Sequence, residues 1–157
     1  MLLPLFESLE ASAIGEAIRN SLWLFPIIES FHLVGLAVIG GAILVVDFRL
    51  LGLGLRSQPI SRLARDVHPW VIGSLVLMIL SGVPLFLSEA IKCYYSFAFW
   101  TKMTALIAAV VFTFTIRRRV AFAPDGHFSP ASYKAVALTS LALWSTVGWG
   151  GRWIGFS

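Results

Sequence analysis

Four long apolar segments constrain this chain more than any other feature of its sequence. They run over residues 22–53, 69–87, 97–116 and 133–156. An α-helix needs about 20 residues to cross a hydrocarbon core roughly 30 Å thick, and each segment has about that length or more. None of them alternates polar and apolar residues in the way the strands of a membrane barrel do. The sequence therefore predicts an all-α integral membrane four-helix bundle, a single four-span membrane domain over residues 1–157.

The composition favours lipid over water as the environment of this domain. Hydrophobic residues make up 58% of the chain and charged residues only 13%, whereas about a quarter of the residues in a soluble domain are charged. The net charge of +4 would suggest nucleic acid binding in a soluble protein. Here the basic residues fall mainly between the apolar segments, so we expect a lipid bilayer as the partner and no nucleic acid.

The basic residues also predict an orientation. Most of them flank two connections, one between the first and second segments and one between the third and fourth. They are Arg49, Arg56, Arg62 and Arg65 in the first group, and Arg117, Arg118, Arg119 and Lys134 in the second. Positively charged loops stay in the cytoplasm. We therefore predict a protein of the bacterial inner (cytoplasmic) membrane with its N-terminus and C-terminus on the periplasmic side.

Two features are predicted at the outer interface. Residues 6–22 place apolar side chains at helical spacing with Glu7, Glu10, Glu16 and Arg19 between them, which predicts a short N-terminal interfacial helix rather than a signal peptide. Aromatic side chains near the outer ends of the spans predict an aromatic belt. They are Tyr94, Tyr95, Trp100, Trp144, Trp149 and Trp153.

Ionisable and sulfur-bearing residues inside the spans are the candidates for function. A charge at the bilayer centre costs at least about 2.5–3.5 kcal/mol, so such residues are rare and tend to be functional. Counting inward from the outer ends places one group at similar depth: Glu29, His32, Met78, Lys102, Met103 and Arg152. An inner group contains Asp47, Arg49, Asp66, His68 and Arg117 to Arg119. We predict that a cofactor site is formed by His32, Met78, Lys102, Arg152, Glu29 and His68.

His32 is the most informative of these residues. It could simply form a hydrogen bond to a neighbouring helix, or it could bind a haem or a metal ion inside the bundle, where such sites are usual. Gly35 lies one turn further along the same helical face, which would leave room for a macrocycle. The sequence makes His32 the candidate metal ligand and haem b the candidate cofactor, with copper as the alternative.

A haem held between His32 and His68 is excluded by depth. His68 is level with about Phe48 of the first span, sixteen residues beyond His32, which is about 24 Å along a helix. The partner of His32 must therefore be another residue at its own depth. Met78 could contribute a thioether, and Lys102 could contribute a neutral amine.

The other polar residues keep alternative interpretations. Lys102 could extend to the outer surface, pair with Glu29, or bind an anionic group such as a haem propionate or a quinone oxygen, and Arg152 has the same choices. His68 is either an interfacial residue or part of an inner pair. Its possible partners are Asp47, Asp66 and His127.

Several short motifs resemble known families. They are His32-Leu33-Val34-Gly35 in the first span, Val67-His68-Pro69 and Ser81-Gly82 in the second, and Phe99-Trp100-Thr101-Lys102 at the start of the third. Over residues 22–116 the chain resembles small bacterial four-helix membrane proteins of the copper-resistance CopD type and the HemJ-type protoporphyrinogen oxidases, or an uncharacterised relative of them. The HemJ-type resemblance implies haem b binding with His32 and Lys102 as functional residues. The CopD-type resemblance implies copper handling on the outer face.

Three functions follow as hypotheses. The first is a haem b-binding, cytochrome b-like membrane protein that transfers electrons to a membrane redox partner or quinone. The second is a copper-handling or transport protein, because imidazole and thioether suit Cu(I). The third is a non-catalytic subunit of a larger membrane complex, and an oligomer or complex is expected in any case. No hydrolase or transferase motif is recognisable, so a redox role is the only enzymatic activity the sequence suggests.

Overall fold

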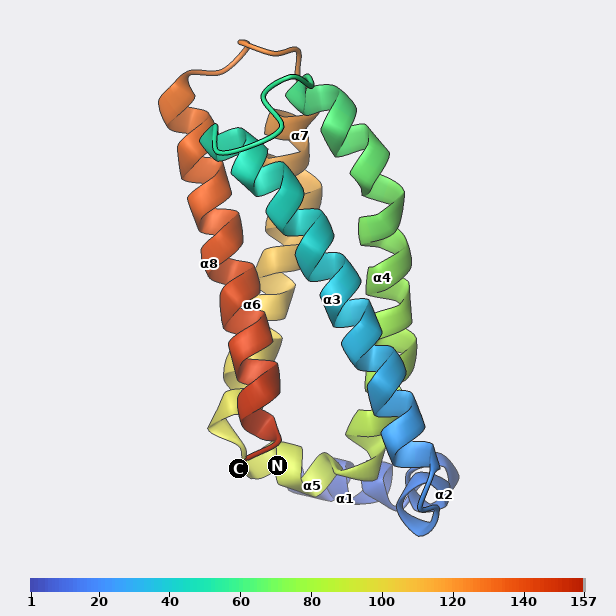
Figure 1. The fold of residues 1–157 in the computed structure, drawn as a ribbon. Coiled ribbons are helices and arrows are strands. Elements are labelled where there is room, and N and C mark those ends of the chain that lie inside the picture. Colours follow the sequence, from blue (N-terminus) through green and yellow to red (C-terminus); the bar gives the residue numbers. More distant parts are fainter. Residues whose placement is uncertain (157) are drawn as a thin grey trace.

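A computed structural model describes residues 1–156, and within these residues the chain is helical and has no strands. The long helices α3 (Leu24–Leu51), α4 (Ile60–Ser88), α6 (Phe97–Phe112) and α8 (Pro130–Ile154) lie side by side (Figure 1). The short helices α1 (Leu3–Glu10), α2 (Ala13–Asn20) and α5 (Ala90–Tyr95) lie across one end, beside both marked termini. The connection between α3 and α4, and the one that leads into α8, lie at the opposite end.

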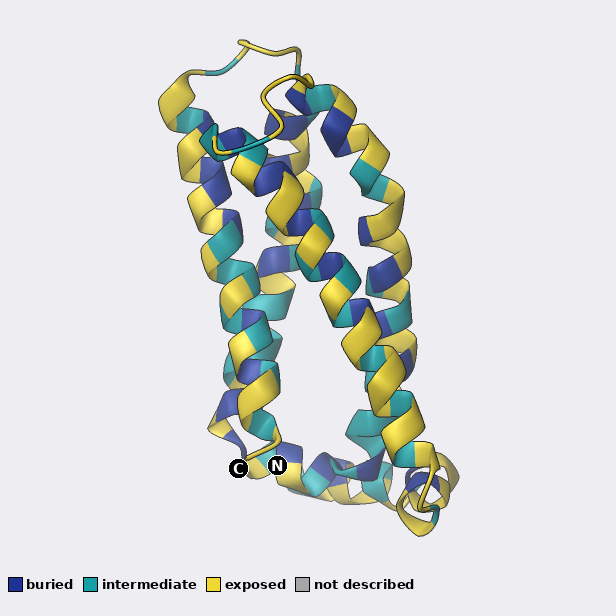
Figure 2. Ribbon diagram, viewed as in Figure 1, coloured by how far each residue is buried: buried dark blue, intermediate teal, exposed yellow. Residues whose placement is uncertain are grey.

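Three helical segments within residues 1–156 are long and apolar enough to cross a membrane: α3, α4 and the continuous segment Phe97–Ala121. Large hydrophobic side chains are exposed along all of them, including Leu44, Leu80 and Ile107 (Figure 2). Such a surface suits lipid, which indicates a membrane protein. The polar residues of α8 leave it outside this group of three.

Helix α3 ends where the sequence suggests. Gly52 has a φ of 79°, the left-handed conformation that glycine adopts without strain. Its backbone N–H bonds the carbonyl of Arg49 at 3.0 Å, and the N–H of Leu53 bonds that of Phe48 at 2.9 Å. These bonds satisfy carbonyls that the end of a helix leaves without partners. The prediction for the first span, residues 22–53, therefore differs from α3 by only two residues at each end.

Helix α4 begins at Ile60, nine residues before the predicted start at residue 69. Pro69 favours a helix start when only the sequence is considered, but here it lies inside the helix. The true start is capped from another part of the chain, because both carboxylate oxygens of Asp125 accept the backbone N–H of Ile60, at 3.1 and 3.2 Å. This added section buries Leu63 and Ala64 in the core.

The third long segment changes its helical type near its end. After α6 the chain forms a π-helix, η1 (Thr113–Arg117), followed by α7 (Arg118–Ala121). It therefore extends five residues beyond the predicted limit at residue 116. Helix α8 starts at Pro130, where the hydroxyl oxygen of Ser129 accepts the N–H of Ser132 at 3.2 Å, and this start is three residues before the predicted one.

The N-terminal segment forms two helices rather than the single one predicted for residues 6–22. The chain breaks at Ser12, which caps α2 by accepting the backbone N–H of Gly15 at 3.3 Å. A serine in this position favours a helix start over a helix interior. The amphipathic spacing was visible in the sequence, but the break depends on this cap.

Candidate functional site

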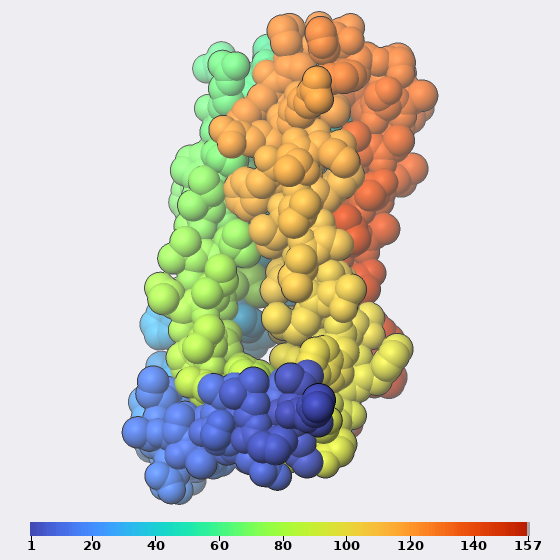
Figure 3. Space-filling view, turned by 180° about the vertical axis from the view of Figure 1, so that it is seen from behind, coloured from blue at the N-terminus to red at the C-terminus, as the bar shows by residue number. Residues whose placement is uncertain are grey.

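The long helices form two pairs that separate toward the end beside the termini. Helix α3 packs along α4, and α6 packs along α8, while α3 and α8 join the pairs. In Figure 1 the two pairs diverge toward α1, α2 and α5. The space-filling view shows a hollow between α4 and α6, directly above the N-terminal helices (Figure 3). His32 and Lys102 lie in this half of the molecule, one on each pair.

His32 is held by the neighbouring helix through Ser81. The ring Nδ1 of His32 lies 2.8 Å from the Ser81 hydroxyl oxygen. When that hydroxyl donates its one proton to the carbonyl of Leu77, 2.7 Å away, its oxygen accepts a proton from Nδ1 of the ring. A neutral imidazole protonated on Nδ1 carries its lone pair on Nε2, the form in which histidine binds a metal.

Glycines allow α3 and α4 to approach each other around His32. A Cβ atom placed on Gly82 would lie 3.2 Å from the His32 ring, and one placed on Gly35 would lie 2.9 Å from the Cγ atom of Met78. Gly35 therefore accommodates Met78 rather than keeping space for a macrocycle. Met78 is 8% exposed and packs in a core cluster with Ile39 and Ile43.

Lys102 lies against the glycines of α8. A Cβ atom on Gly150 would lie 3.0 Å from that of Lys102, and one on Gly151 would lie 3.5 Å from the Lys102 ammonium nitrogen. Lys102 is close enough to His32 for the two charges to interact. Within residues 1–156 no carboxylate forms an ion pair with it. The suggested Glu29–Lys102 ion pair is therefore not formed.

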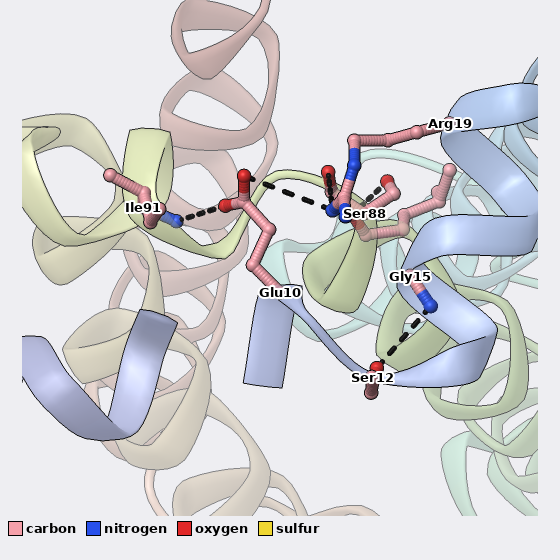
Figure 4. A network of polar contacts seen from close by, with 7 residues as sticks. Glu10, Ser12, Gly15, Arg19, Ser88 and Ile91 are labelled. Atoms are coloured by element: carbon pink, nitrogen blue, oxygen red, sulfur yellow. Dashed lines mark hydrogen bonds and ion pairs between the residues drawn. The ribbon is translucent and has the colours of Figure 1, made fainter. Parts of the chain in front are cut away.

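A polar network fastens the N-terminal helices to this end of the bundle (Figure 4). Glu10 accepts the backbone N–H of Ile91 at 2.6 Å and lies 3.8 Å from the Arg19 guanidinium. Arg19 in turn donates to the carbonyl of Ser88 at 3.2 Å. The ring of Phe6 contacts those of Phe86, Tyr94 and Trp100. Helices α1 and α2 thus cover the end of the space between the two helix pairs.

Three of the predicted site residues lie elsewhere. Glu29 is exposed on α3. Arg152 is also exposed, and its guanidinium lies over the ring of Phe156 at 4.7 Å. His68 contacts the rings of Phe114 and Phe122 near the other end of α4. It precedes Ser81 by thirteen residues, or about 20 Å along the helix, which agrees with the exclusion of a shared ligand site with His32.

The inner group centres on a pair that we did not predict. Arg117 Nε donates to Asp47 Oδ1 at 2.8 Å, and both side chains are buried. A second guanidinium nitrogen of Arg117 donates to the carbonyl of Ile43 at 3.3 Å. Asp47 thus binds Arg117, not His68. Nearby, Trp144 donates from its indole N–H to the Thr113 hydroxyl at 3.1 Å. Trp144 packs against the inner core cluster and is not part of the predicted outer aromatic belt.

We call the region of His32, Ser81 and Lys102 the outer site. Cys93 on α5 is buried near it, close enough for the charge of Lys102 to act on the thiol. Burial raises the pKa of its thiol to about 11, and the nearby Glu89 carboxylate acts in the same direction. The thiol therefore stays protonated near neutral pH and is a poor metal ligand. Within the described residues, no three His, Cys, Asp or Glu side chains are grouped closely enough to hold a metal ion.

Comparison with known proteins places the chain in a family. A family described as "Family of unknown function (DUF6644)" matches residues 5–157. The chain belongs to this family. The match includes both helix pairs and nearly all of the N-terminal helices that cover the outer site. No curated protein and no solved structure matches the chain significantly.

Sequence reasoning about this DUF6644 member missed Ser81 as the partner of His32 and Arg117 as the partner of Asp47. Ser81 is one of only two polar side chains in the predicted second span, so its presence there was a usable signal. Arg117 begins a run of three arginines, and such a run gives no indication which member is buried. The buried member, Arg117, is the last residue of the π-helix, a helical type that has no clear signal in the sequence.

Proposed function

We propose that this protein is a four-span, haem b-binding membrane protein that transfers electrons, with His32 as an axial ligand of the haem. The supporting observation is the bond between His32 and Ser81, because it leaves the lone pair on Nε2 of a half-buried imidazole. Haem iron is commonly held by histidine. A ligating histidine normally donates its other ring proton to a neighbouring group, which is the arrangement found here.

Four crossings are part of this proposal. Helix α8 has 25 residues, about 37 Å of helix, and it packs along α6 and α3. Its length therefore suffices to cross the bilayer beside them. With α8 as the fourth span, the Arg-rich connections lie in the cytoplasm and both termini in the periplasm of a bacterial inner membrane.

A haem at this level would lie between the two helix pairs, with one candidate ligand on each pair. Gly82 gives the His32 ring a neighbour without a side chain, and Gly150 and Gly151 do the same for Lys102. Lys102 comes from the opposite helix pair, so it could provide a neutral amine as the second ligand or an ammonium for a propionate. Met78 fits less well than we expected, because its side chain fills the contact between α3 and α4 at Gly35.

The remaining residues would protect and orient such a group. A bound haem supplies one-electron redox chemistry. Ser81 fixes the orientation of His32, and the N-terminal helices limit access of water from the outer face. Electrons would pass to or from a quinone or another membrane redox protein. The resemblance to HemJ-type proteins supports the same pair, His32 and Lys102, and remains part of the proposal.

Optical spectroscopy of the purified full-length protein tests this function. Protein from haem-replete cells should show a Soret band and yield haem b on pyridine extraction. His32→Ala should lose the haem, whereas His68→Ala, a histidine substitution on the other side of the bilayer, should retain it. Ser81→Ala should weaken haem binding by about 10- to 100-fold, as expected for loss of a group that orients a ligand. Wild-type protein without haem, or a His32→Ala variant with normal haem content, would refute the proposal.

The same preparations distinguish the two alternatives. A copper-handling protein would need His32 and Met78 to share a Cu(I) ion, which would require Met78 to leave its packed position. Copper in the purified protein, lost in both His32→Ala and Met78→Leu, would favour that function. A stoichiometric partner in a native purification, together with full function of His32→Ala, would instead favour a structural subunit.

A further inference from the structure

A small pocket opens at the other end of the bundle, between α4 and the segment formed by η1 and α7. Its polar lining comes from His68, Thr113, Arg117 and Arg118, and apolar side chains complete the wall. Its interior has room for a single water-sized object. One oxygen atom of a larger anion would therefore fit inside, with the rest of the anion at the mouth.

The buried end of this pocket has unused hydrogen-bond donors. Arg117 is 6% exposed, and a guanidinium has five N–H donors. Within the described residues, two hydrogen bonds of Arg117 are formed, one to Asp47 and one to the Ile43 carbonyl. Because Arg117 also lines the pocket, its remaining donors are available to an acceptor there. An acceptor of this kind is more favourable if it carries negative charge.

The π-helix positions two of these residues. Thr113 and Arg117 are the first and last residues of η1, and both line the pocket. Each also bonds to another helix: Thr113 accepts from Trp144 of α8, and Arg117 donates to Asp47 of α3. π-Helical turns occur frequently at functional sites. Here the turn directs a hydroxyl and a guanidinium into one small space while anchoring both to the bundle.

The mouth of the pocket is positively charged. The guanidinium of Arg118 lies over the ring of Phe122, 5.4 Å from its centre, and both residues line the pocket. The negative charge of Asp47 is neutralised by Arg117. The positive charge of Arg118 therefore gives the pocket a net positive charge. Asp66 is exposed on α4 and does not line the pocket. The local field therefore attracts an anion.

We propose that this pocket binds a phosphate group, with one phosphate oxygen placed beside Arg117 and the remaining charge met by Arg118. Basic pockets between membrane helices on the cytoplasmic side are suited to anionic lipid headgroups, and the Arg-rich end of this bundle would lie at that depth. The phosphate belongs either to an anionic phospholipid or to a free phosphate ion. The inference depends on the membrane location of α4 and α6, and it is independent of haem binding at the other end.

Arg118→Gln and Arg119→Gln form a matched pair for testing this site. Both arginines are exposed neighbours on α7, but only Arg118 lines the pocket. Each substitution removes one charge, so a nonspecific attraction to anionic lipid would weaken equally in both. The full-length protein and each variant are placed in bilayers of phosphatidylcholine alone, or of phosphatidylcholine with an equal amount of phosphatidylglycerol. Retained lipid is then measured by native mass spectrometry.

Wild-type protein should retain phosphatidylglycerol, Arg118→Gln should bind it about fivefold more weakly, and Arg119→Gln should match the wild type. If no lipid is retained, titration with inorganic phosphate in phosphatidylcholine bilayers tests the free ion as the source. Binding of the ion that depends on Arg118 also supports the site. Equal losses in the two variants, or no binding of either source, would overturn the proposal.

Discussion

Among the individual residues, the buried Asp47–Arg117 pair leads to a specific prediction about stability. Both side chains are buried, and their charge-assisted bond joins α3 to η1. The Ser140 hydroxyl is buried close to the Asp47 carboxylate. A buried ion pair contributes little compared with well-packed apolar residues, but removing one partner leaves the other charge uncompensated. The loss of either partner should therefore be more damaging than the loss of both.

Removal of the Asp47 charge tests this interpretation. Asp47→Asn should destabilise the protein by about 3–5 kcal/mol because it leaves Arg117 buried without a counterion. Asp47→Asn combined with Arg117→Gln should be less destabilised than the sum of the single variants, since the two sites interact directly. The free energy of unfolding in detergent would be followed by tryptophan fluorescence. Asp66→Asn, which changes an exposed carboxylate on α4, is the control; additive effects at Asp47 and Arg117 would contradict the coupling.

Residue types and depth predicted part of the site, and side-chain direction determined the rest. Counting residues from the outer ends placed His32 and Lys102 at one level, and in the structure the charge of Lys102 acts on His32. The same count could not show that Glu29 and Arg152 face outward, because depth is independent of rotation about the helix axis. It also could not distinguish a methionine that fills a core, such as Met78, from one that faces a cofactor.

At the scale of the elements, the N-terminal helices are fixed in place by a close backbone contact. A Cβ atom on Gly15 would lie 2.5 Å from the carbonyl oxygen of Leu87. No side chain can occupy that space unless α2 moves away from α4. Helix α2 therefore depends on a residue with no side chain at its contact point, in addition to the polar network of Glu10 and Arg19.

Gly15→Ala should therefore loosen the cover over the outer site. Crowding of this kind costs about 1–3 kcal/mol, and the backbone of Leu87 cannot yield as a flexible side chain would. We expect faster hydrogen exchange in α1, α2 and α5 than in the wild type, with little change in α8. Ala17→Ser, an exposed substitution on the same helix, is the control. Unchanged exchange in Gly15→Ala would show that α2 does not rest on α4 in solution.

Element boundaries were predictable where local chemistry sets them. The end of α3 follows from Gly52, and the start of α8 has a local signal in Ser129 and Pro130, although we predicted that start at residue 133. In contrast, the start of α4 depends on Asp125, which is 65 residues away in the chain. The first and last residues of the π-helix also bond to distant parts of the chain: Thr113 accepts from Trp144, and Arg117 donates to Asp47. Contacts across such distances are not visible in a local pattern.

At the scale of the whole molecule, the arrangement separates two sites. The outer site lies where the helix pairs diverge, and the proposed phosphate site lies at the Arg-rich end. The core clusters centred on Ile43 and Val46 fill the region between them. The sequence predicted an all-helical chain, and the two Arg-rich connections do lie at the same end of the bundle. It did not predict that the two pairs would separate, since apolar helices in a bundle show no clear preference among apolar neighbours.

The orientation of the molecule is the last point to test, and α8 decides it. The chain would carry single cysteines in a Cys93→Ser background at Ser57, Ser129 and Phe156, all exposed positions in the described structure. With four crossings, a membrane-impermeant maleimide added to spheroplasts should label Phe156→Cys at once. It should label Ser57→Cys and Ser129→Cys only after permeabilisation, because these two positions lie at the Arg-rich end. If α8 does not cross, Ser129→Cys and Phe156→Cys will share one labelling pattern. In that case Gly150 and Gly151 could not line a site at the depth of Lys102, so the proposed haem site would lose one of its walls.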